Sequence, residues 1–452
     1  MASRIKNLTD GRPAALIFTF ALPLMIGNVF QQLYTVVDTM VVGKALGVSA
    51  LAALGAADWL NWLMLGIIQG ITQGFGILMA QEFGAGKYEN LRKTIGCSVS
   101  LSLLFSLLLL GCGQFVARPI LTLLQTPPEI IDNSLLYLRI MYLGVPVVMS
   151  YNLFATVLRS LGDGKTPLHA MIVAAITNIV LDFLFVLVFG LGISGAAIAT
   201  LIAQLISSLF CLYHIRRIEI LTLCSSDFQL RNDLSSKLLM LGFPMAFQNA
   251  IIAIGGMIVQ FVVNGFGVIF IAGFTATNKL YGVLEVAATS YGYAMVTYAG
   301  QNLGAGRTDR IRKGMRAAVW IALITSAVIA VVMLFGGKAI LSCFISGTPE
   351  EFNQTLQIAY YYLAIMSICL PILYILHVTR STIQGMGNTI LPMVSGIAEF
   401  IMRALTAVLL PMLIGETGIF YAEILAWIGA DVILISSYFV VVRNMEKLLK
   451  QT

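Results

Sequence analysis

An aspartate inside a long apolar stretch is the strongest sign of chemistry in this chain. Asn178 and Asp182 are four residues apart, so on an α-helix they share one face and lie one turn apart. The flanking residues 170–176 and 183–189 are almost wholly apolar, which predicts a membrane-spanning helix that carries a carboxylate. Because an ionisable group inside a bilayer is costly, it indicates a functional site. The alternative is an aspartate that a neighbouring helix holds for packing alone.

The composition indicates that the rest of the chain is also embedded in a membrane. Of 452 residues, 59% are hydrophobic and 11% are charged, with a mean hydropathy of +0.91, whereas soluble domains carry about 25% charged residues. The expected fold class is therefore an all-α polytopic membrane protein. At about 20 apolar residues per span, we expect twelve transmembrane helices, at approximately 14–43, 50–80, 93–117, 131–158, 168–189, 193–216, 238–264, 270–300, 313–336, 354–379, 390–413 and 418–442.

The basic residues fall in alternate loops and so predict the topology. They cluster after the second, fourth, sixth and eighth expected helices and at the end of the chain, as Lys87, Arg92, Lys93, Arg159, Lys165, Arg216, Arg217, Arg231, Lys237, Arg307, Arg310, Arg312, Lys313, Arg316, Arg443, Lys447 and Lys450. The opposite loops hold little beyond Lys44, Arg118 and Lys338. The positive-inside rule then places both termini in the cytoplasm. The net charge of +6 has the same origin, so no nucleic-acid partner is expected.

Two short motifs recur after about 220 residues. Residues 81–87 (QEFGAGK) return as 301–307 (QNLGAGR), and 161–167 (LGDGKTP) correspond to 386–392 (MGNTILP). Each half therefore holds six helices in the same orientation, which predicts two pseudo-symmetric six-helix bundles around a central cavity. The polar segment between them sets the expected boundaries, with an N-terminal lobe at 1–218, a cytoplasmic linker at 219–236 and a C-terminal lobe at 237–452.

The layout of six plus six helices, the Gly-Ala-Gly-basic loops and the loop at 159–167 resemble the multidrug and toxic compound extrusion (MATE) family over nearly the whole chain. The resemblance implies the MATE fold in a bacterial cytoplasmic (inner) membrane. It implies a secondary active antiporter that exports amphipathic or cationic compounds in exchange for inward Na+ or H+. The expected partners are such small molecules and membrane lipids, and the chain is expected to act as a monomer.

Four oxygen-bearing side chains could converge in the first lobe: Asp38, Asn178, Asp182 and Thr200. Asp182 lies about eight residues, or roughly 12 Å, below the outer end of its helix, and the other helices place their residues at similar depth. Such oxygens suit a small cation, and two close carboxylates can instead share a proton. By the resemblance, these positions match the cation site of the DinF-like branch of the family. Pro23 in the first helix is the expected hinge for the movement that cation binding would cause.

The second lobe departs from this pattern. The repeat places Arg403 opposite Asn178 and Ala407 opposite Asp182, so the site is not duplicated. Glu399 and Arg403 are four residues apart on one helix, which predicts an internal ion pair with a structural role.

Two further ionisable residues lie in the apolar helices of the second lobe. Glu285 falls in the middle of the eighth expected helix, where it could bind a cationic substrate or a proton, or be a satisfied core carboxylate. His377 lies near the cytoplasmic end of the tenth, where a packing or capping role is the expectation.

Two other functions remain as alternatives. A flippase of the same superfamily, moving lipid-linked oligosaccharides, would need several basic residues in its cavity to bind pyrophosphate. Only Arg139 and Arg403 could form such a set. An integral membrane enzyme would need metal-ligand or nucleophile spacing, and the six cysteines show none. The GKT at 164–166 is no phosphate-binding loop, since Arg159 stands where that motif needs Gly. The chain is therefore expected to be no enzyme and to hold no cofactor beyond the coupling ion.

Overall fold

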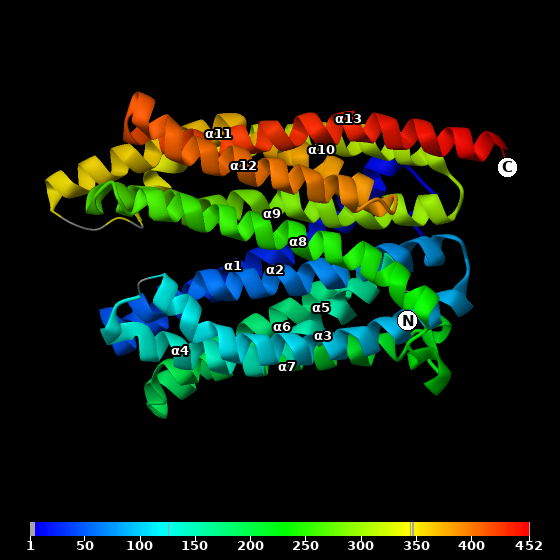
Figure 1. Cartoon of the computed structure of the whole chain (residues 1–452), viewed down its shortest axis with the longest axis horizontal. Coiled ribbons are helices and arrows are strands. Elements are labelled where there is room, and N and C mark those ends of the chain that lie inside the picture. The colour runs from blue at the N-terminus through cyan, green and yellow to red at the C-terminus, as the bar shows by residue number, and fades with distance from the viewer. Residues whose placement is uncertain (1–4, 125, 344, 346–347, 452) are drawn as a thin grey trace. The chain divides into compact units, whose positions relative to one another are not determined.

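The protein is built almost entirely of long α-helices (Figure 1). The computed structural model describes residues 5–124, 126–343, 345 and 348–451. The first half contains α1 (Pro13–Leu46), α2 (Val48–Gly84), α3 (Tyr88–Leu123), α4 (Pro128–Leu143), α5 (Val145–Ser160), α6 (Lys165–Asp182), the π-helical segment η1 (Phe183–Val188), α7 (Gly192–Ile215) and the short 3-10 turns η2 (Glu219–Leu221) and η3 (Ser225–Phe228). The second half contains α8 (Asn232–Val263), α9 (Val268–Gly304), α10 (Thr308–Ser342), α11 (Pro349–Gly385), α12 (Ile390–Ile414), the 3-10 segment η4 (Glu416–Tyr421) and α13 (Ala422–Gln451).

These elements follow the twelve expected helices in order. By length and composition, ten of the described helices could each cross a membrane, and the bent pair α4 and α5 makes an eleventh. The pair corresponds to the single helix expected at 131–158 and is bent by 50°, because Pro146 at the start of α5 cannot continue the hydrogen bonds of α4. The remaining expected span corresponds to α9, which is 37 residues long and is not one of these ten helices. It contains two charged residues, Lys279 and Glu285. The prediction of an all-α polytopic membrane protein is confirmed.

The chain forms two compact units, and two of the three borders between them lie inside helices. Unit 1 contains Leu22–Ala250 and the described residues up to Leu8, whereas unit 2 contains Thr9–Ala21 and the chain from Ile251 onward. Two borders thus fall within α1 and α8, and the third lies just before α1. The predicted lobes, 1–218 and 237–452, follow the sequence repeat rather than these contacts. As a result, the beginning of α1 belongs to unit 2 and the rest of α1 to unit 1.

The repeated Gly-Ala-Gly-basic motif of the second half anchors the segment that leads into α1. Arg307 Nη1 donates to the carbonyl oxygen of Thr9 at 2.8 Å and lies 2.6 Å from Asp10 Oδ1. Arg310 is oriented by Asn302, whose Oδ1 accepts from its Nε at 3.0 Å. These contacts lie within unit 2 and fix where α1 begins.

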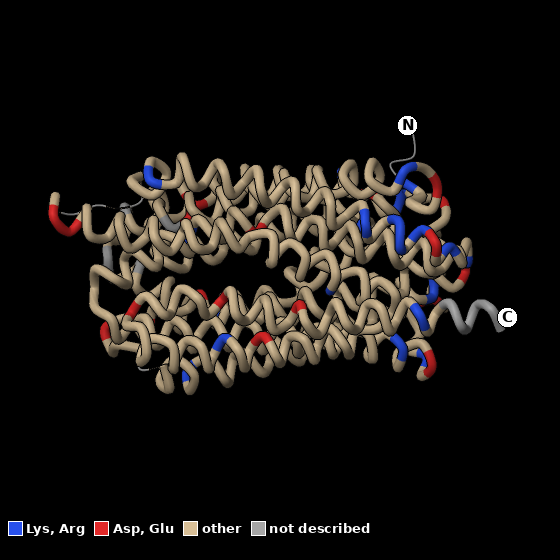
Figure 2. Tube along the Cα trace, turned by 90° about the horizontal axis from the view of Figure 1, so that it is seen from above, with Lys and Arg blue, Asp and Glu red and all other residues tan. Residues whose placement is uncertain are grey.

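In each unit, the Lys and Arg residues gather toward one end of the helices (Figure 2). By residue number, basic residues of unit 1 lie in and beside the loops that precede α3, α6 and α8, and those of unit 2 in and beside the loop between α9 and α10. The side chains of Lys44, Lys447 and Lys450, also used to predict topology, lie outside those described. Large apolar residues remain exposed along the helices, among them Leu104, Phe115 and Phe335, as expected where the surrounding solvent is lipid.

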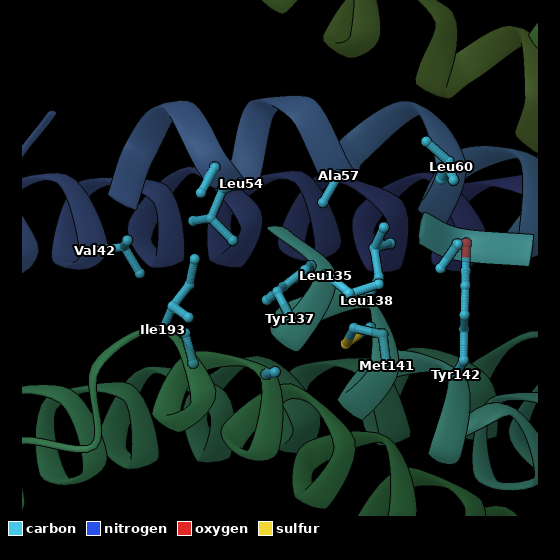
Figure 3. Packing of buried hydrophobic residues seen from close by; sticks show 14 of the residues in the cluster. Val42, Leu54, Ala57, Leu60, Leu135, Tyr137, Leu138, Met141, Tyr142 and Ile193 are labelled. Carbon is cyan, nitrogen blue, oxygen red and sulfur yellow. The ribbon is translucent and has the colours of Figure 1, made fainter. Parts of the chain in front are cut away.

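A buried apolar cluster in unit 1 positions the last part of α1. Its members come mainly from α1, α2, α4 and α7 and include Val42, Leu54, Ala57, Leu60, Leu135, Tyr137, Leu138, Met141, Tyr142 and Ile193 (Figure 3). On α1 the cluster takes up Val41 and Val42, and Val37 packs against it. The neighbours of Asp38 are therefore held in a close-packed interior, which limits where its carboxylate can lie.

Helices α2 and α8 approach each other closely through glycines in unit 1. A Cβ atom on Gly70 would lie 2.4 Å from the backbone of Ala246, and one on Gly74 would lie 2.5 Å from the Cα atom of Gly242. One turn before Gly70, the carbonyl oxygen of Gly66 accepts a hydrogen bond from Asn249 Nδ2 at 3.0 Å. Small residues at four-residue spacing let membrane helices pack at short distance, and here only glycine fits.

We expect Gly70→Leu to lower the stability of the protein by about 1–3 kcal/mol or more, because the leucine would push α8 away from α2. The measurement is the thermal unfolding midpoint of the purified protein in detergent. Gly111→Leu is the matched control, since nothing lies within 4 Å of a Cβ atom at that position. Equal stability of the two variants would show that the close approach of α2 and α8 does not hold.

Candidate functional site

The four predicted cation-site residues of the first lobe come from α1, α6 and α7. Asn178 and Asp182 lie in the last two turns of α6 and are buried, with 1% and 0% of their surface exposed. Asn178 Nδ2 donates to Thr200 Oγ1 of α7 at 3.3 Å. Asp38 of α1 is close enough to Asp182 for the two carboxylates to interact electrostatically. The four side chains therefore occupy one region of unit 1.

Several oxygen atoms of this group lack a protein partner. Asp38 Oδ1, Asn178 Oδ1 and both carboxylate oxygens of Asp182 are buried and accept no hydrogen bond from any described residue. Buried polar atoms in proteins are normally paired, and an unpaired buried carboxylate is very costly. A proton or a small cation would remove that cost, because it supplies the positive charge that the surrounding helices do not. Two carboxylates, an amide oxygen and a hydroxyl can chemically accept either one.

Asp182 also marks a change in helix geometry. The α-helical hydrogen-bond pattern of α6 ends at this residue, and the chain continues as the π-helical segment Phe183–Val188. π-helical turns are rare in proteins, and those that occur are often found at functional sites. The apolar run at 183–189 gives no sign of it in the sequence, which predicted one regular helix at 168–189.

A small cavity with a largely apolar lining adjoins the group and adds residues that sequence reasoning missed. It has a volume of about 20 Å³, enough for a water molecule or a small ion, and is lined by Gln31, Tyr34, Tyr151, Met171, Ala174, Asn178, Thr200, Ala203, Gln204 and Ser207. Tyr34 lies within electrostatic range of both Asp38 and Asp182. A signal was available for part of this set, because Gln31, Tyr34 and Asp38 share one face of α1 at helical spacing. Thr200, Gln204 and Ser207 of α7 likewise share one helix face, whereas Tyr151 of α5 carries no such signal.

The second unit holds a buried network of charges instead of a repeated site. Arg403 Nη2 lies 2.9 Å from Glu399 Oε1 and 2.7 Å from Glu423 Oε2, and Arg380 Nη2 lies 2.6 Å from Glu399 Oε2. The expected Glu399–Arg403 pair is thus part of a four-residue network across α11, α12 and α13. Ala407, opposite Asp182 in the repeat, is fully buried and brings no charge.

Sequence reasoning missed Arg380 and gave Glu423 no role. Arg380 is the only Lys or Arg in α11, so an unpaired charge in an apolar helix was the available signal. Glu285 and His377, considered separately from the sequence, face each other, with Glu285 Oε1 3.3 Å from His377 Nε2. Pro23 lies inside α1, next to the border between the two units, which falls between Ala21 and Leu22.

The two units should respond oppositely when a buried acid is removed. At about pH 8 without Na+, we expect Asp182→Asn to stabilise the protein by about 1 kcal/mol or more, because an unpartnered buried carboxylate is replaced by a neutral group. Glu399→Gln, the matched comparison, should lose about 3–5 kcal/mol, because it leaves two buried guanidinium groups without their shared partner. Thermal unfolding in detergent measures both. A destabilised Asp182→Asn would mean that structural contacts hold this carboxylate.

Comparison with known proteins identifies the family. A family model described as MatE matches residues 23–184 and 244–409, which together are most of the chain. The chain therefore belongs to the MatE family, whose members are membrane transporters. It is a multi-pass membrane protein and no enzyme.

Two curated relatives come from Bacillus subtilis (strain 168). The chain is 29% identical over 386 residues to the "Probable multidrug resistance protein YoeA", across 84% of this chain and 82% of that protein. It is 31% identical over 305 residues to the "Probable multidrug resistance protein YpnP", across 68% of each. A crystal structure of MATE in complex with MaL6 superposes with a TM-score of 0.88 at 21% identity, covering 98% of this chain and 99% of that one. The prediction of the MATE fold is confirmed.

Proposed function

We propose that this protein is a secondary active multidrug antiporter. It exports amphipathic or cationic compounds while Na+ or H+ enters through Asp38, Asn178, Asp182 and Thr200. The observation that carries the proposal is the pair of interacting carboxylates, Asp38 and Asp182, with buried oxygens that no described residue satisfies. The substrate class is supported by the names of YoeA and YpnP, both multidrug resistance proteins.

The location and partners follow from the same relatives and from the distribution of charge. The protein works in the bacterial cytoplasmic membrane with both termini in the cytoplasm, because basic residues collect at one end of the helices in each unit. It functions as a monomer surrounded by lipid, and small molecules are its partners. The coupling ion is its only cofactor.

Cation binding acts by neutralising two acids that belong to different helices. Without a cation, Asp38 of α1 and Asp182 of α6 repel each other, so separating the two helices is favoured. A bound cation or proton removes the repulsion, and the oxygens of Asn178 and Thr200 can complete its coordination. The occupied site therefore favours a position of α1 near α6, and the empty site favours a different one.

Pro23 is the proposed hinge of this movement. It removes one backbone hydrogen bond from α1, which makes bending cheapest there. The contacts of Arg307 with Thr9 and Asp10 hold the segment before the hinge, so the part that bears Asp38 is the part that moves.

Exchange requires that the cation and the drug prefer different conformations. Each ligand can shift the equilibrium only by its difference in affinity for the two states. If the cation stabilises the state with low drug affinity, its entry releases the drug outside, and drug binding from the cytoplasm favours release of the cation.

The flippase alternative finds little support in the second unit. The buried guanidinium groups of Arg380 and Arg403 are already engaged by Glu399 and Glu423, so they are committed to carboxylates rather than to a pyrophosphate. Arg139, the other arginine of that alternative, is exposed on α4. A multidrug antiporter needs no such basic set.

The proposal is tested in cells that lack their own efflux pumps. The wild-type protein should lower the accumulation of tetraphenylphosphonium, and Asp182→Asn or Asp38→Asn should reduce the efflux rate at least about tenfold, because the coupling charge is lost. Asp132→Asn, which changes an exposed aspartate of α4, is the matched control and should transport normally. Unchanged accumulation on expressing the wild type would contradict drug export, and normal efflux by Asp182→Asn would contradict the site.

The coupling ion is identified in proteoliposomes. Efflux is measured with a Na+ gradient at fixed pH and then with a pH gradient in the absence of Na+. We expect whichever gradient drives transport to fail in Asp182→Asn, since both ions would use the same carboxylates. Transport driven equally well without any cation gradient would exclude antiport.

A further inference from the structure

The second unit contains a carboxylate and an imidazole that the proposed exchange mechanism does not use. We propose that Glu285 and His377 form a second proton-binding site, which titrates independently of the acids in the first unit. The inference rests on residues of unit 2 alone and does not depend on which compounds the protein exports.

The geometry joins the two side chains directly. Glu285 lies in the middle of α9 and His377 in the second half of α11, with His377 Nε2 3.3 Å from Glu285 Oε1. The two helices are fixed to each other nearby, because Tyr374 OH donates to the carbonyl oxygen of Leu284 at 2.9 Å. The pair is therefore held by the backbones of two packed helices.

The side chains of the pair are only partly buried. Those of Glu285 and His377 are 26% and 18% exposed, and that of Glu423 in the neighbouring arginine network is 19% exposed. Arg380, Glu399 and Arg403 of that network are more deeply buried, at 8%, 5% and 5%. Among the described residues, His377 is the one ion-pair partner within 4.0 Å of Glu285. Arg380 and Arg403 pair instead with Glu399 and Glu423.

Both acidic and basic groups surround the pair. Glu285 interacts electrostatically with Tyr281 of α9, Tyr374 of α11 and Glu423 of α13, and His377 interacts with Glu399 of α12. One step farther out, Arg380 of α11 and Arg403 of α12 pair with Glu399 and Glu423, and Asp431 of α13 interacts with Arg380 and Glu399. The charged residues of α10 lie only near its two ends. This part of unit 2 therefore contains two guanidinium groups and four carboxylates. The guanidinium groups are those of Arg380 and Arg403, and the carboxylates are those of Glu285, Glu399, Glu423 and Asp431.

One of these acids is itself short of a partner. Asp431 is 7% exposed, and its Oδ1 atom is buried without a hydrogen bond from any described residue. Its charge acts on both Arg380 and Glu399. The cluster thus holds an excess of negative charge, and a positive imidazolium at His377 reduces that excess.

The chemistry of the pair selects a proton over a metal ion. A hydronium ion transfers a proton to Nε2 of neutral His377. One O–H bond of the hydronium breaks and leaves water, an N–H bond forms, and this N–H group then donates to the ionised Glu285 Oε1. In the part of the chain that the structure describes, no group of three or more His, Cys, Asp and Glu residues could hold a metal ion.

Protonation at His377 would act on the whole network. His377 lies in electrostatic range of Glu399, and Glu285 lies in range of Glu423. These are the two acids that bind Arg403. A proton on the imidazole therefore weakens the attraction of Glu399 and Glu423 for Arg403. The packing of α12 and α13 then depends on pH through the pair.

Trp427 is a natural reporter for the experiment. Its ring stacks on Tyr281 with centroids 6.1 Å apart, and Tyr281 precedes Glu285 by one helical turn. Replacing the other tryptophans by Trp59→Phe, Trp62→Phe and Trp320→Phe leaves Trp427 as the only one. The emission of this full-length parent is then followed against pH in lipid nanodiscs.

We expect one reversible emission change in the range of about pH 5–8, where imidazole titrates. His377→Gln should abolish it, and Glu285→Gln should move its midpoint to lower pH by at least about one unit, because the carboxylate that stabilises the imidazolium is gone. Asp182→Asn is the matched control and should titrate like the parent. Size-exclusion chromatography and circular dichroism establish that each variant is folded, and Glu285→Gln serves as the test if His377→Gln does not fold.

Three outcomes would overturn the proposal. The parent may show no transition, the transition may persist in His377→Gln, or it may vanish in Asp182→Asn. If the parent lacks a transition while tetraphenylphosphonium quenches Trp427 in the parent but not in Glu285→Gln, the pair binds organic cations instead of a proton. The fluorescence titration requires no transport, so its failure leaves the efflux assays intact, and failed efflux leaves this titration intact.

Discussion

A carboxylate enclosed among apolar helices must be neutralised, because neither lipid nor packed side chains can replace the water it has lost. The two units of this protein meet that requirement in different ways. In unit 2, Glu399 is bound by the guanidinium groups of Arg380 and Arg403, and Arg403 also binds Glu423. In unit 1, the oxygens of Asp182 have no such partner among the described residues.

Because of this difference, the two halves of a repeated sequence have different electrostatic properties. An arginine supplies permanent positive charge, and the ion pairs of Arg380 and Arg403 link α11, α12 and α13 in unit 2. The acids of unit 1 depend on a charge that can arrive and leave. In the proposed mechanism, that dependence is what couples ion entry to the movement of α1. A guanidinium near Asp182 would stabilise the fold and abolish the exchange.

Helix α1 connects the features that the mechanism needs. Its beginning is held by Arg307, Pro23 follows within the helix, and Asp38 lies farther on among residues that the apolar cluster of unit 1 surrounds. Because two borders of the compact units fall within α1 and α8, these two helices are shared between the units. A change of charge at Asp38 therefore acts on a helix that belongs to both.

The sequence by itself determined the fold class and the approximate limits of twelve helices, and it predicted Asp38, Asn178, Asp182 and Thr200 as a cation site. These follow from local properties, since hydropathy sets a span and the period of 3.6 residues sets which side chains share a face. The pair Glu399–Arg403 was predictable for the same reason, because both residues lie on one helix.

Only the tertiary structure decided which side chains meet across helices. Arg380 with Glu399, Arg403 with Glu423, and Glu285 with His377 each join different helices. The π-helical turn after Asp182, the cavity beside Asn178 and the division of α1 between units were equally hidden. The physical reason is that such contacts depend on the order, rotation and depth at which helices pack, and no single helix's sequence carries that information.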